Sequence, residues 1–350
     1  MLKVFGWSER DASLGSHYYR MQGPLVEAQH QGLLTWTQNV TINQDAERSE
    51  VIICPGLADP GAVHRWELIA SAGYRLLVAE HDDDLINPRP DNPFFRLGRV
   101  DYETYRREYV PLVGRAMDVS DLVIVSVPYL REVYAEHTTT PIVVVPNTVD
   151  DVLLEVPQAA RDAGERLRVG WGGSSSHDLD WQTCADGVRA GIVETGAQLE
   201  LMGHDYRRLI GVPDATHVPW TTAIEQYYLW MSRQHVIVAP LADDQFNRSK
   251  SPLKALEAAA LGIPVVASDA GPYRDFVRHG ETGFLCRTDD DWVDALRALA
   301  TDEDRRLAMG RAGRAQASEL TMQKWAPVWA GHFRDGLVAK FGDAVRALWE

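Results

Sequence analysis

The stretch FNRSKSPLKALEAAALGIPVVASD, residues 246–269, contains a basic segment, a short helix and an apolar strand in succession. Ser251 is a suitable N-cap, and Pro252 suits the first helical position, where no backbone N–H is needed. The helix should end at Gly262, because the Ile-Pro pair that follows is a stop signal. The run IPVVASD (263–269) is then a strand. The stretch therefore reads as one helix–strand unit of an α/β fold.

Similar units extend outward from this stretch in both directions. Strands in an α/β protein are covered on both faces and therefore read as short apolar runs between helical segments. The other runs of this kind are LKVFGW (2–7), LLTWTQN (33–39), EVIICP (50–55), YRLLVAEH (74–81), LVIVSV (122–127), PIVVVPN (141–147), RLRVGWGG (166–173), QLELMG (198–203), QHVIVAP (234–240) and TGFLC (282–286). This alternation predicts two Rossmann-like domains with doubly wound parallel sheets.

The domain boundaries follow from where the alternation stops and restarts. We expect an N-terminal domain (1–150), a polar, Ala-rich linker (151–166), a second domain (167–325) and a tail helix (326–350) that crosses back to the first domain. A capping box formed by Thr301 and Asp304 should open the helical tail. Ligands of such sheets bind at the carboxyl ends of the strands, so the expected site is a cleft between the two sheets.

Composition narrows the class of protein. The 350 residues carry 35 basic and 50 acidic side chains, a net charge of −15, which disfavours nucleic acid or an anionic membrane as a partner. No apolar run approaches the ~18 residues of a membrane span, and the first residues lack the apolar core of a signal peptide. The three cysteines, Cys54, Cys184 and Cys286, are far apart and form no metal motif. We therefore expect a cytoplasmic protein without stable membrane insertion.

Basic residues gather around the start of the helix in the opening stretch. Arg248, Lys250 and Lys254 lie within about one turn of its N-terminus, where free N–H groups favour anions. In a chain of strong negative charge this predicts a phosphate or diphosphate site. Glu257, in the second turn, could accept hydrogen bonds from a pair of sugar hydroxyls. The alternative interpretation is a solvated helix start with surface lysines.

The segment SPLKALEAAALGIPVVASDAGPYRDFVRHGETGFL (251–285) resembles the signature region of retaining nucleotide-sugar glycosyltransferases with two Rossmann domains, the GT-B fold of the glycosyl transferases group 1 or family 4 type. The family carries a Glu-x7-Glu motif. Its second Glu corresponds to Glu257, which the resemblance implies binds the nucleotide ribose. Its first falls on Ser249, and the usual Gly after it is Lys250. How the donor sugar hydroxyls are held is therefore open.

The resemblance extends over most of the chain and implies a set of donor-binding residues. VVVPNTVD (143–150), DLVIVSVPYLREVY (121–134) and LRVGWGGSSSHDLDW (167–181) resemble other parts of the family. The glycine-rich loop in the last of these permits close approach of a ligand to the backbone. Its His177 could bond a diphosphate or cap its own helix, and we favour the cap. The predicted donor-binding residues are Gly172, Gly173, His177, Arg248, Lys250, Ser251, Leu253, Lys254 and Glu257.

Acidic residues and a histidine crowd the end of the strand YRLLVAEH. Glu80 and His81 are followed by Asp82, Asp83 and Asp84, whose mutual repulsion favours a functional cause. By the resemblance, His81 and Asp82 match the family's His-Asp pair that faces the donor sugar and the acceptor. The alternatives are a metal site of the D-x-D type, formed by Asp82 and Asp84, and a solvated acidic loop.

The residues predicted to act on the substrates complete this picture. His81, Asp82 and Lys250 are the predicted catalytic residues, and Gly15, Ser16, Arg20 and Asp83 are predicted on the acceptor side. Arg20 could instead pair with an acid at the surface. The tryptophans Trp171, Trp220, Trp230 and Trp325 favour core or hinge packing over a sugar-binding platform.

The resemblance implies a glycosyltransferase that moves a sugar from a nucleotide-diphosphate donor to an acceptor hydroxyl with retention of configuration. The basic residues replace a metal ion at the diphosphate, so we expect neither metal nor another cofactor. The acceptor is a glycan, a lipid-linked sugar, a protein or a small molecule. A nucleotide-sugar isomerase or hydrolase on the same fold, and a non-catalytic glycan-binding homologue, are the alternatives.

Overall fold

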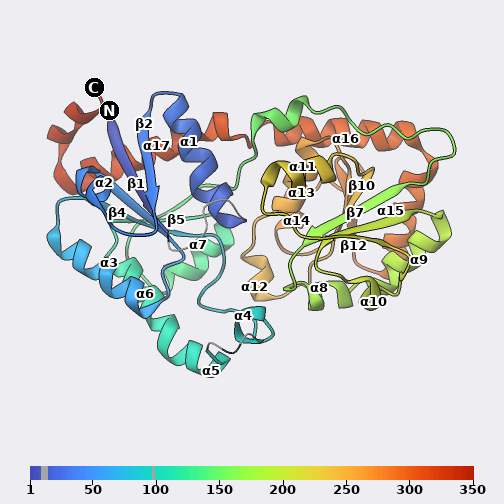
Figure 1. Cartoon of the computed structure of the whole chain (residues 1–350), viewed down its shortest axis with the longest axis horizontal. Helices are drawn as coiled ribbons and strands as arrows, with labels where there is room; N and C mark the ends of the chain where they lie inside the picture. Colours follow the sequence, from blue (N-terminus) through green and yellow to red (C-terminus); the bar gives the residue numbers. More distant parts are fainter. Residues whose placement is uncertain (9–14, 97, 99) are drawn as a thin grey trace. The chain divides into compact units, whose positions relative to one another are not determined.

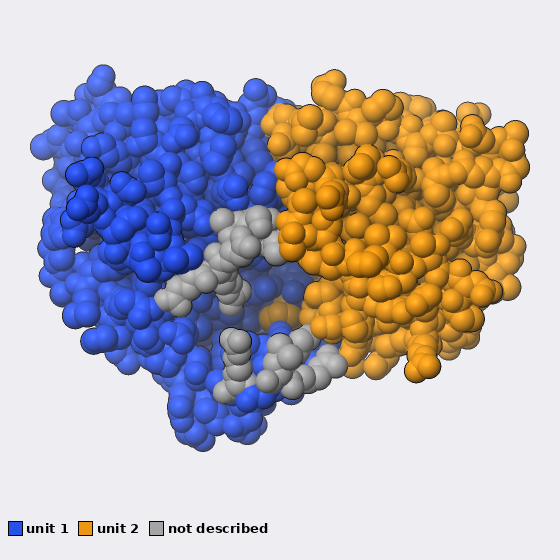
Figure 2. Space-filling view, viewed as in Figure 1, with its two compact units in different colours: residues 1–148, 249–251, 322–350 blue, residues 149–248, 252–321 orange. Residues whose placement is uncertain are grey.

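The chain forms two compact units, each built around one sheet. The computed structural model describes residues 1–350 except 9–14, 97 and 99. Unit 1 consists of residues 1–148, 249–251 and 322–350, and unit 2 of residues 149–248 and 252–321 (Figure 2). In each unit the helices cover both faces of the sheet (Figure 1).

Unit 1 contains a six-stranded parallel sheet in the order β2-β1-β3-β4-β5-β6. The strands are β1 (Leu2–Trp7), β2 (Leu34–Asn39), β3 (Val51–Pro55), β4 (Leu76–His81), β5 (Leu122–Val125) and β6 (Ile142–Val144). The helices are η1 (Tyr18–Gln22), α1 (Gly23–His30), α2 (Gln44–Arg48), α3 (Pro60–Ala72), α4 (Pro93–Arg96), α5 (Tyr102–Thr104), η2 (Tyr105–Tyr109), α6 (Val110–Asp118), α7 (Pro128–Ala135), α17 (Met322–Phe341) and η4 (Asp343–Leu348).

Unit 2 contains a second six-stranded parallel sheet in the order β12-β11-β10-β7-β8-β9. The strands are β7 (Arg168–Gly173), β8 (Gln198–Gly203), β9 (Thr216–Val218), β10 (Val236–Ala239), β11 (Val265–Ser268) and β12 (Gly283–Cys286). The helices are η3 (Asp151–Glu155), α8 (Asp178–Gln182), α9 (Ala185–Thr195), α10 (Arg207–Ile210), α11 (Ile224–Met231), α12 (Gln245–Arg248), α13 (Leu253–Ala260), α14 (Gly271–Phe276), α15 (Asp289–Thr301) and α16 (Glu303–Ala317).

The two parallel sheets confirm the predicted doubly wound α/β class. In unit 1, alternate strand residues point to opposite faces, so that Phe5 packs with α3, α6 and α7 while Val4 packs with α1 and α17. The last long helix contributes Trp329 and Phe333, both fully buried, to the second of these cores. The C-terminal residues are therefore part of the hydrophobic core of unit 1.

The predicted capping box of Thr301 and Asp304 is wrong. Thr301 ends α15, and the carboxylate of Asp302 caps α16 by accepting from the backbone N–H of Arg305, because an aspartate lies at the position where the chain turns between the two helices. Of the tryptophans expected in core or hinge packing, Trp171 and Trp230 are buried, whereas Trp220 is 49% exposed and packs against the Tyr227 ring.

Candidate functional site

The strand order of unit 2 reverses between β7 and β10, which places a crevice at the carboxyl ends of these two strands. The loop after β7 holds the predicted glycine-rich segment. The loop after β10 leads through α12 to the start of α13. Sequence and topology thus direct the predicted donor-binding residues of unit 2 to one edge of its sheet.

The start of α13 has no side-chain cap. Leu253 is its first residue, and the N-cap position is occupied by Pro252, which has no suitable side chain. Ser251 does not cap the helix as predicted, because its hydroxyl accepts a hydrogen bond from the Asn147 Nδ2 atom at 2.6 Å. The helix ends as predicted before Gly262, whose φ of +70° is the left-handed conformation that glycine tolerates. The backbone N–H groups at the start of the helix remain suited to an anion.

The three predicted cations have separate partners. The Arg248 Nε atom donates to the Asp243 carboxylate at 2.8 Å, and both side chains are largely exposed. Lys250 belongs to unit 1, where its ammonium group lies 3.1 Å from the Asp83 Oδ1 atom. Lys254 in unit 2 lies over the Trp171 ring, 5.6 Å from its centre. Unit 2 therefore contributes two of the three cations, and the third is held by an acid of unit 1.

Glu257 lies in the interior of unit 2. Its side chain is 3% exposed, and its Oε2 atom accepts a hydrogen bond from the Tyr227 hydroxyl at 3.0 Å. Burial, followed by the nearby Glu257 charge, raises the pKa of Tyr227 well above its usual value, so Tyr227 remains a donor. Sequence reasoning missed Tyr227, because nothing in its helix distinguishes it from a core aromatic residue. The pair forms a carboxylate fixed in position by a buried phenol.

The glycine-rich loop after β7 makes room for neighbouring aromatic rings. A Cβ atom on Gly172 would lie 2.9 Å from the Tyr227 ring, and one on Gly173 would lie 2.7 Å from the Trp171 ring. At least part of the need for glycine is therefore internal packing.

His177 does not cap its helix with its side chain, contrary to the interpretation favoured from the sequence. Its Nδ1 atom lies 2.7 Å from the Asp180 Oδ2 atom, because that carboxylate, 1% exposed, needs buried partners. The Asp180 Oδ1 atom accepts from the Asn247 Nδ2 atom at 2.8 Å. Asp180 and Asn247, which sequence reasoning missed, thus join the loop after β7 to the segment after β10.

In unit 1, His81 and Asp82 lie at the carboxyl end of β4. His81 is 1% exposed, and its ring, 4.8 Å from that of Tyr134, has no hydrogen-bond partner among the described residues. Burial lowers the pKa of His81 to about 4, so the ring is neutral at pH 7. Burial raises the pKa of Asp82, while hydrogen bonds to Ser16 and Ser126 oppose the shift.

The remaining acids of this segment have different environments. Asp83 pairs with Lys250. Asp84 is fully buried and accepts hydrogen bonds from the backbone of Ile86 and from both nitrogens of Asn87 at 2.9–3.0 Å, so its carboxylate stabilises its own loop. This assignment disfavours the D-x-D alternative. Over the described parts of the chain, no group of three or more His, Cys, Asp or Glu side chains is arranged to hold a metal ion.

Arg20 forms a buried ion pair. It is fully buried, and its Nε atom lies 2.6 Å from the Glu80 Oε1 atom. Its Nη1 atom donates to the Val145 carbonyl and to the Asn147 Oδ1 atom. Burial raises the pKa of Glu80 to about 7, against the opposing effect of Arg20. Arg20 therefore pairs with an acid, as one of the two predictions had it, but in the interior and not at the surface.

Comparison with known proteins connects this geometry to a family. Residues 180–302 match the family model of the glycosyl transferases group 1. A D-inositol 3-phosphate glycosyltransferase of Nocardia farcinica is 41% identical over 100 residues, which is 28% of this chain and 20% of that protein. A GDP-mannose-dependent alpha-(1-6)-phosphatidylinositol monomannoside mannosyltransferase of Mycobacterium tuberculosis is 39% identical over 93 residues, 26% of this chain and 21% of that protein. The matched segment thus spans about a fifth of these curated relatives.

Solved structures show the same fold over nearly the whole chain. Sucrose-phosphate synthase from Thermosynechococcus elongatus superposes with a TM-score of 0.68 and 15% identity, covering 96% of this chain and 99% of the other. The Anabaena protein Alr3699/HepE, solved in complex with UDP and glucose, superposes with a TM-score of 0.65 and 14% identity, covering 96% and 100%. The predicted GT-B fold is thereby confirmed. No helix in the described ranges is both long and apolar enough to cross a membrane.

Proposed function

We propose that this chain, a GT-B protein whose residues 180–302 match the glycosyl transferases group 1, transfers a sugar from a nucleotide-diphosphate donor to an acceptor hydroxyl. The family match and the names of the relatives support the reaction class. Retention of configuration is implied by the resemblance of residues 251–285 to the retaining enzymes.

The observation that carries the proposal is the arrangement around α13 in unit 2. An uncapped helix start at the β7–β10 reversal provides N–H groups for a diphosphate, and Arg248 and Lys254 add positive charge near it. Glu257 follows in the second turn as a buried, fixed carboxylate, suited to the hydroxyl pair of a ribose. A relative that uses GDP-mannose and a structural neighbour solved with UDP support a nucleotide sugar as the donor.

Unit 1 is proposed to serve the acceptor and the transferred sugar. His81 is neutral at pH 7 and has nitrogens available for hydrogen bonds, and Asp82 beside it is a half-buried carboxylate. Lys250 is proposed to stabilise the leaving diphosphate, with Gly15, Ser16, Arg20 and Asp83 on the acceptor side. Because Arg20 is fully buried, its part is to hold Glu80 and Asn147 and not to contact the acceptor.

Cationic side chains perform the electrostatic task in this proposal. Negative charge grows on the diphosphate as the glycosidic bond breaks, and groups aimed at that charge lower the barrier. No metal ion or other cofactor is then required. The three cysteines are buried thiols, which suits a reducing cytoplasm.

The test is calorimetry with UDP, GDP and ADP, followed by product analysis with the matching nucleotide sugars. Tight binding of one diphosphate and sugar transfer to an added acceptor would support the proposal. Donor conversion without any acceptor would favour an isomerase or hydrolase. Glycan binding without turnover of any nucleotide sugar would identify a non-catalytic homologue.

A further inference from the structure

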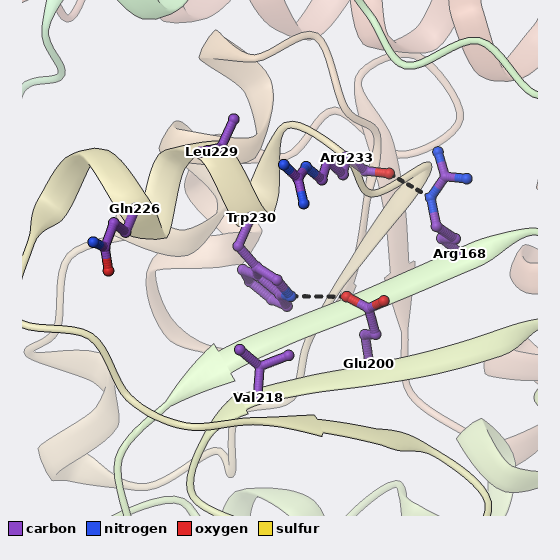
Figure 3. Close-up of a pocket in the computed structure, with 7 residues that line it drawn as sticks. All are labelled: Arg168, Glu200, Val218, Gln226, Leu229, Trp230 and Arg233. Carbon is purple, nitrogen blue, oxygen red and sulfur yellow. Dashed lines mark hydrogen bonds between the residues drawn. The ribbon is translucent and has the colours of Figure 1, made fainter.

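A cavity of about 570 Å³ lies in unit 2 between α11 and the strands β7, β8 and β9 (Figure 3). This volume is within the range of ~300–1,000 Å³ that small-molecule sites occupy. Arg168, which lines the cavity, is the first residue of β7, whereas the predicted donor loop follows the other end of that strand at Gly173. The cavity extends from there to Val218 at the end of β9, and the residues that line it differ from the predicted donor-binding residues.

A fixed carboxylate forms part of the cavity wall. On β8, Leu199 and Leu201 point into the hydrophobic core, so Glu200 faces the opposite side, toward α11. Its Oε2 atom accepts hydrogen bonds from the Trp230 Nε1 and Gln234 Nε2 atoms, both at 2.9 Å. Its Oε1 atom has no partner within the described part of the chain. Glu200 is half-buried, so this second carboxylate oxygen is open to a ligand in the cavity.

Positive charge and apolar surface complete the lining. The Arg168 guanidinium is held by Glu165, by His235 and by the carbonyl of Arg233. The guanidinium of Arg233 itself is exposed and makes no hydrogen bond or ion pair with the residues that the structure describes. The cavity therefore offers one arginine that is fixed and one that is available to an anion.

The apolar part of the wall comes from Val218 on β9 and from Leu229 and Trp230 on α11, which are labelled in Figure 3. Leu229 is 56% exposed although it is a large aliphatic side chain. Such a surface suits the C–H face of a sugar ring or of another compact organic molecule.

We propose that this cavity binds a small hydroxylated anion of the sugar-phosphate class. A hydroxyl group donates to the Glu200 Oε1 atom, the phosphate pairs with Arg233, and the carbon skeleton lies against Val218 and Leu229. A carboxylate acceptor selects a hydroxyl-bearing molecule, and an arginine selects an anion, so the site requires both groups in one ligand.

The cavity is connected to the predicted ribose carboxylate by packed side chains. Trp230, which donates a hydrogen bond to Glu200, stacks on Tyr227 with ring centres 6.0 Å apart and an interplanar angle of 27°. The Tyr227 hydroxyl in turn donates to Glu257. A ligand that reorients Glu200 should therefore alter the affinity of Glu257 for a nucleotide. This second step rests on the proposed function, whereas binding to the cavity does not.

The binding test is calorimetry of the full chain with glucose 6-phosphate, glucose and inorganic phosphate. We expect glucose 6-phosphate to bind at least about tenfold more tightly than either glucose or phosphate, because its hydroxyl and phosphate groups can contact Glu200 and Arg233 at the same time. Glu200→Gln keeps an acceptor for the Trp230 N–H and should stay folded. It and Arg233→Ala should each weaken binding about fivefold or more, whereas Arg208→Ala, which removes an exposed arginine elsewhere in unit 2, should not.

Absence of measurable glucose 6-phosphate binding, or binding that both cavity variants retain, would overturn the assignment. The coupling is tested by the affinity for UDP or GDP with and without saturating glucose 6-phosphate, because linkage must be reciprocal. An unchanged nucleotide affinity would refute the coupling while leaving the cavity site. A protein that binds glucose 6-phosphate through these residues but no nucleotide would refute the proposed function and not the cavity site.

Discussion

Replacement of Glu257 by glutamine isolates the role of its charge. The side chain is 3% exposed and accepts a hydrogen bond from the buried Tyr227 hydroxyl at 3.0 Å. Glutamine has nearly the same shape and keeps a carbonyl oxygen for that hydroxyl, so the free energy of unfolding should change by less than about 1 kcal/mol. Alanine would leave the Tyr227 hydroxyl buried without an acceptor, at a cost of ~1–3 kcal/mol, and would mix stability with binding.

The expected effect on binding follows from hydrogen-bond energies. A bond to a charged group contributes ~1.5–3 kcal/mol and a neutral one about 1 kcal/mol. Loss of the charge opposite a ribose hydroxyl pair should therefore cost ~1–2 kcal/mol, or a rise in Kd of about 5- to 30-fold. The measurement is calorimetry with the preferred nucleoside diphosphate, alongside thermal unfolding of both proteins.

Two controls distinguish the ribose contact from an indirect effect. A 2′,3′-dideoxy nucleotide lacks the hydroxyl pair, so the wild-type protein should bind it more weakly while Glu257→Gln loses little further affinity. Tyr227→Phe removes only the phenol that orients the carboxylate and should weaken binding less than Glu257→Gln does. A folded Glu257→Gln protein with the wild-type Kd, or an equal loss of affinity for both nucleotides, would refute the reasoning.

The remaining predictions concern the other predicted residues. Lys250→Ala should lower kcat strongly and move KM less, because charge on the diphosphate grows in the transition state; a change in KM alone would make it a binding contact. Activity should survive EDTA, and His81→Ala should lower turnover without weakening nucleotide binding; turnover that is lost in EDTA and restored by Mg²⁺ or Mn²⁺ would contradict this. Burial lowers the pKa of His81 and His235 to about 4, so the unfolded chain binds more protons and stability should rise between about pH 4 and 6.5. The raised pKa values of Glu80, about 7, and of Asp82 act in the opposite sense, and each group contributes at most about 1.4 kcal/mol per pH unit. His235→Gln should therefore lower the slope of unfolding free energy against pH, measured by urea unfolding between about pH 4 and 6.5, and an unchanged slope would contradict this. Ser249→Glu should destabilise the protein by several kcal/mol in the same assay, whereas Ser249→Ala should cost much less.

Strands were the best predicted part of the fold because their signal is local. Each of the eleven predicted runs coincides with a strand of the two sheets, and the runs at 74–81 and 166–173 end at the predicted residues. The exception is β9 (Thr216–Val218), a three-residue edge strand whose sequence has no apolar run. A strand of this length is defined by its hydrogen bonds to β8, and a local sequence pattern carries no information about that pairing.

The predicted site residues depend on contacts between distant parts of the chain, and here the sequence was less informative. Ser251 fits the N-cap pattern, yet its hydroxyl bonds Asn147, more than 100 residues away in sequence. Glu257 was identified by its place in the second turn of the helix and by resemblance, but its partner Tyr227 lies on another helix. Composition and motif specify which residue types gather near α13. Their hydrogen-bond partners are fixed by the tertiary structure.

The difference from the family motif at Ser249 also has an explanation in tertiary contacts that the sequence alone did not show. The family motif has a glutamate at this position, whereas here the serine is fully buried and belongs to unit 1. A glutamate there would need space for one more methylene group and for a carboxylate in place of the hydroxyl, as well as partners for a buried charge, and a serine-sized site meets neither requirement. The adjacent Lys250 instead pairs with the Asp83 carboxylate, 3.1 Å away. Where the motif has a glutamate and then a glycine, this chain has Ser249 and Lys250. The lysine holds the Asp83 carboxylate, from the acidic end of β4, beside the segment 249–251.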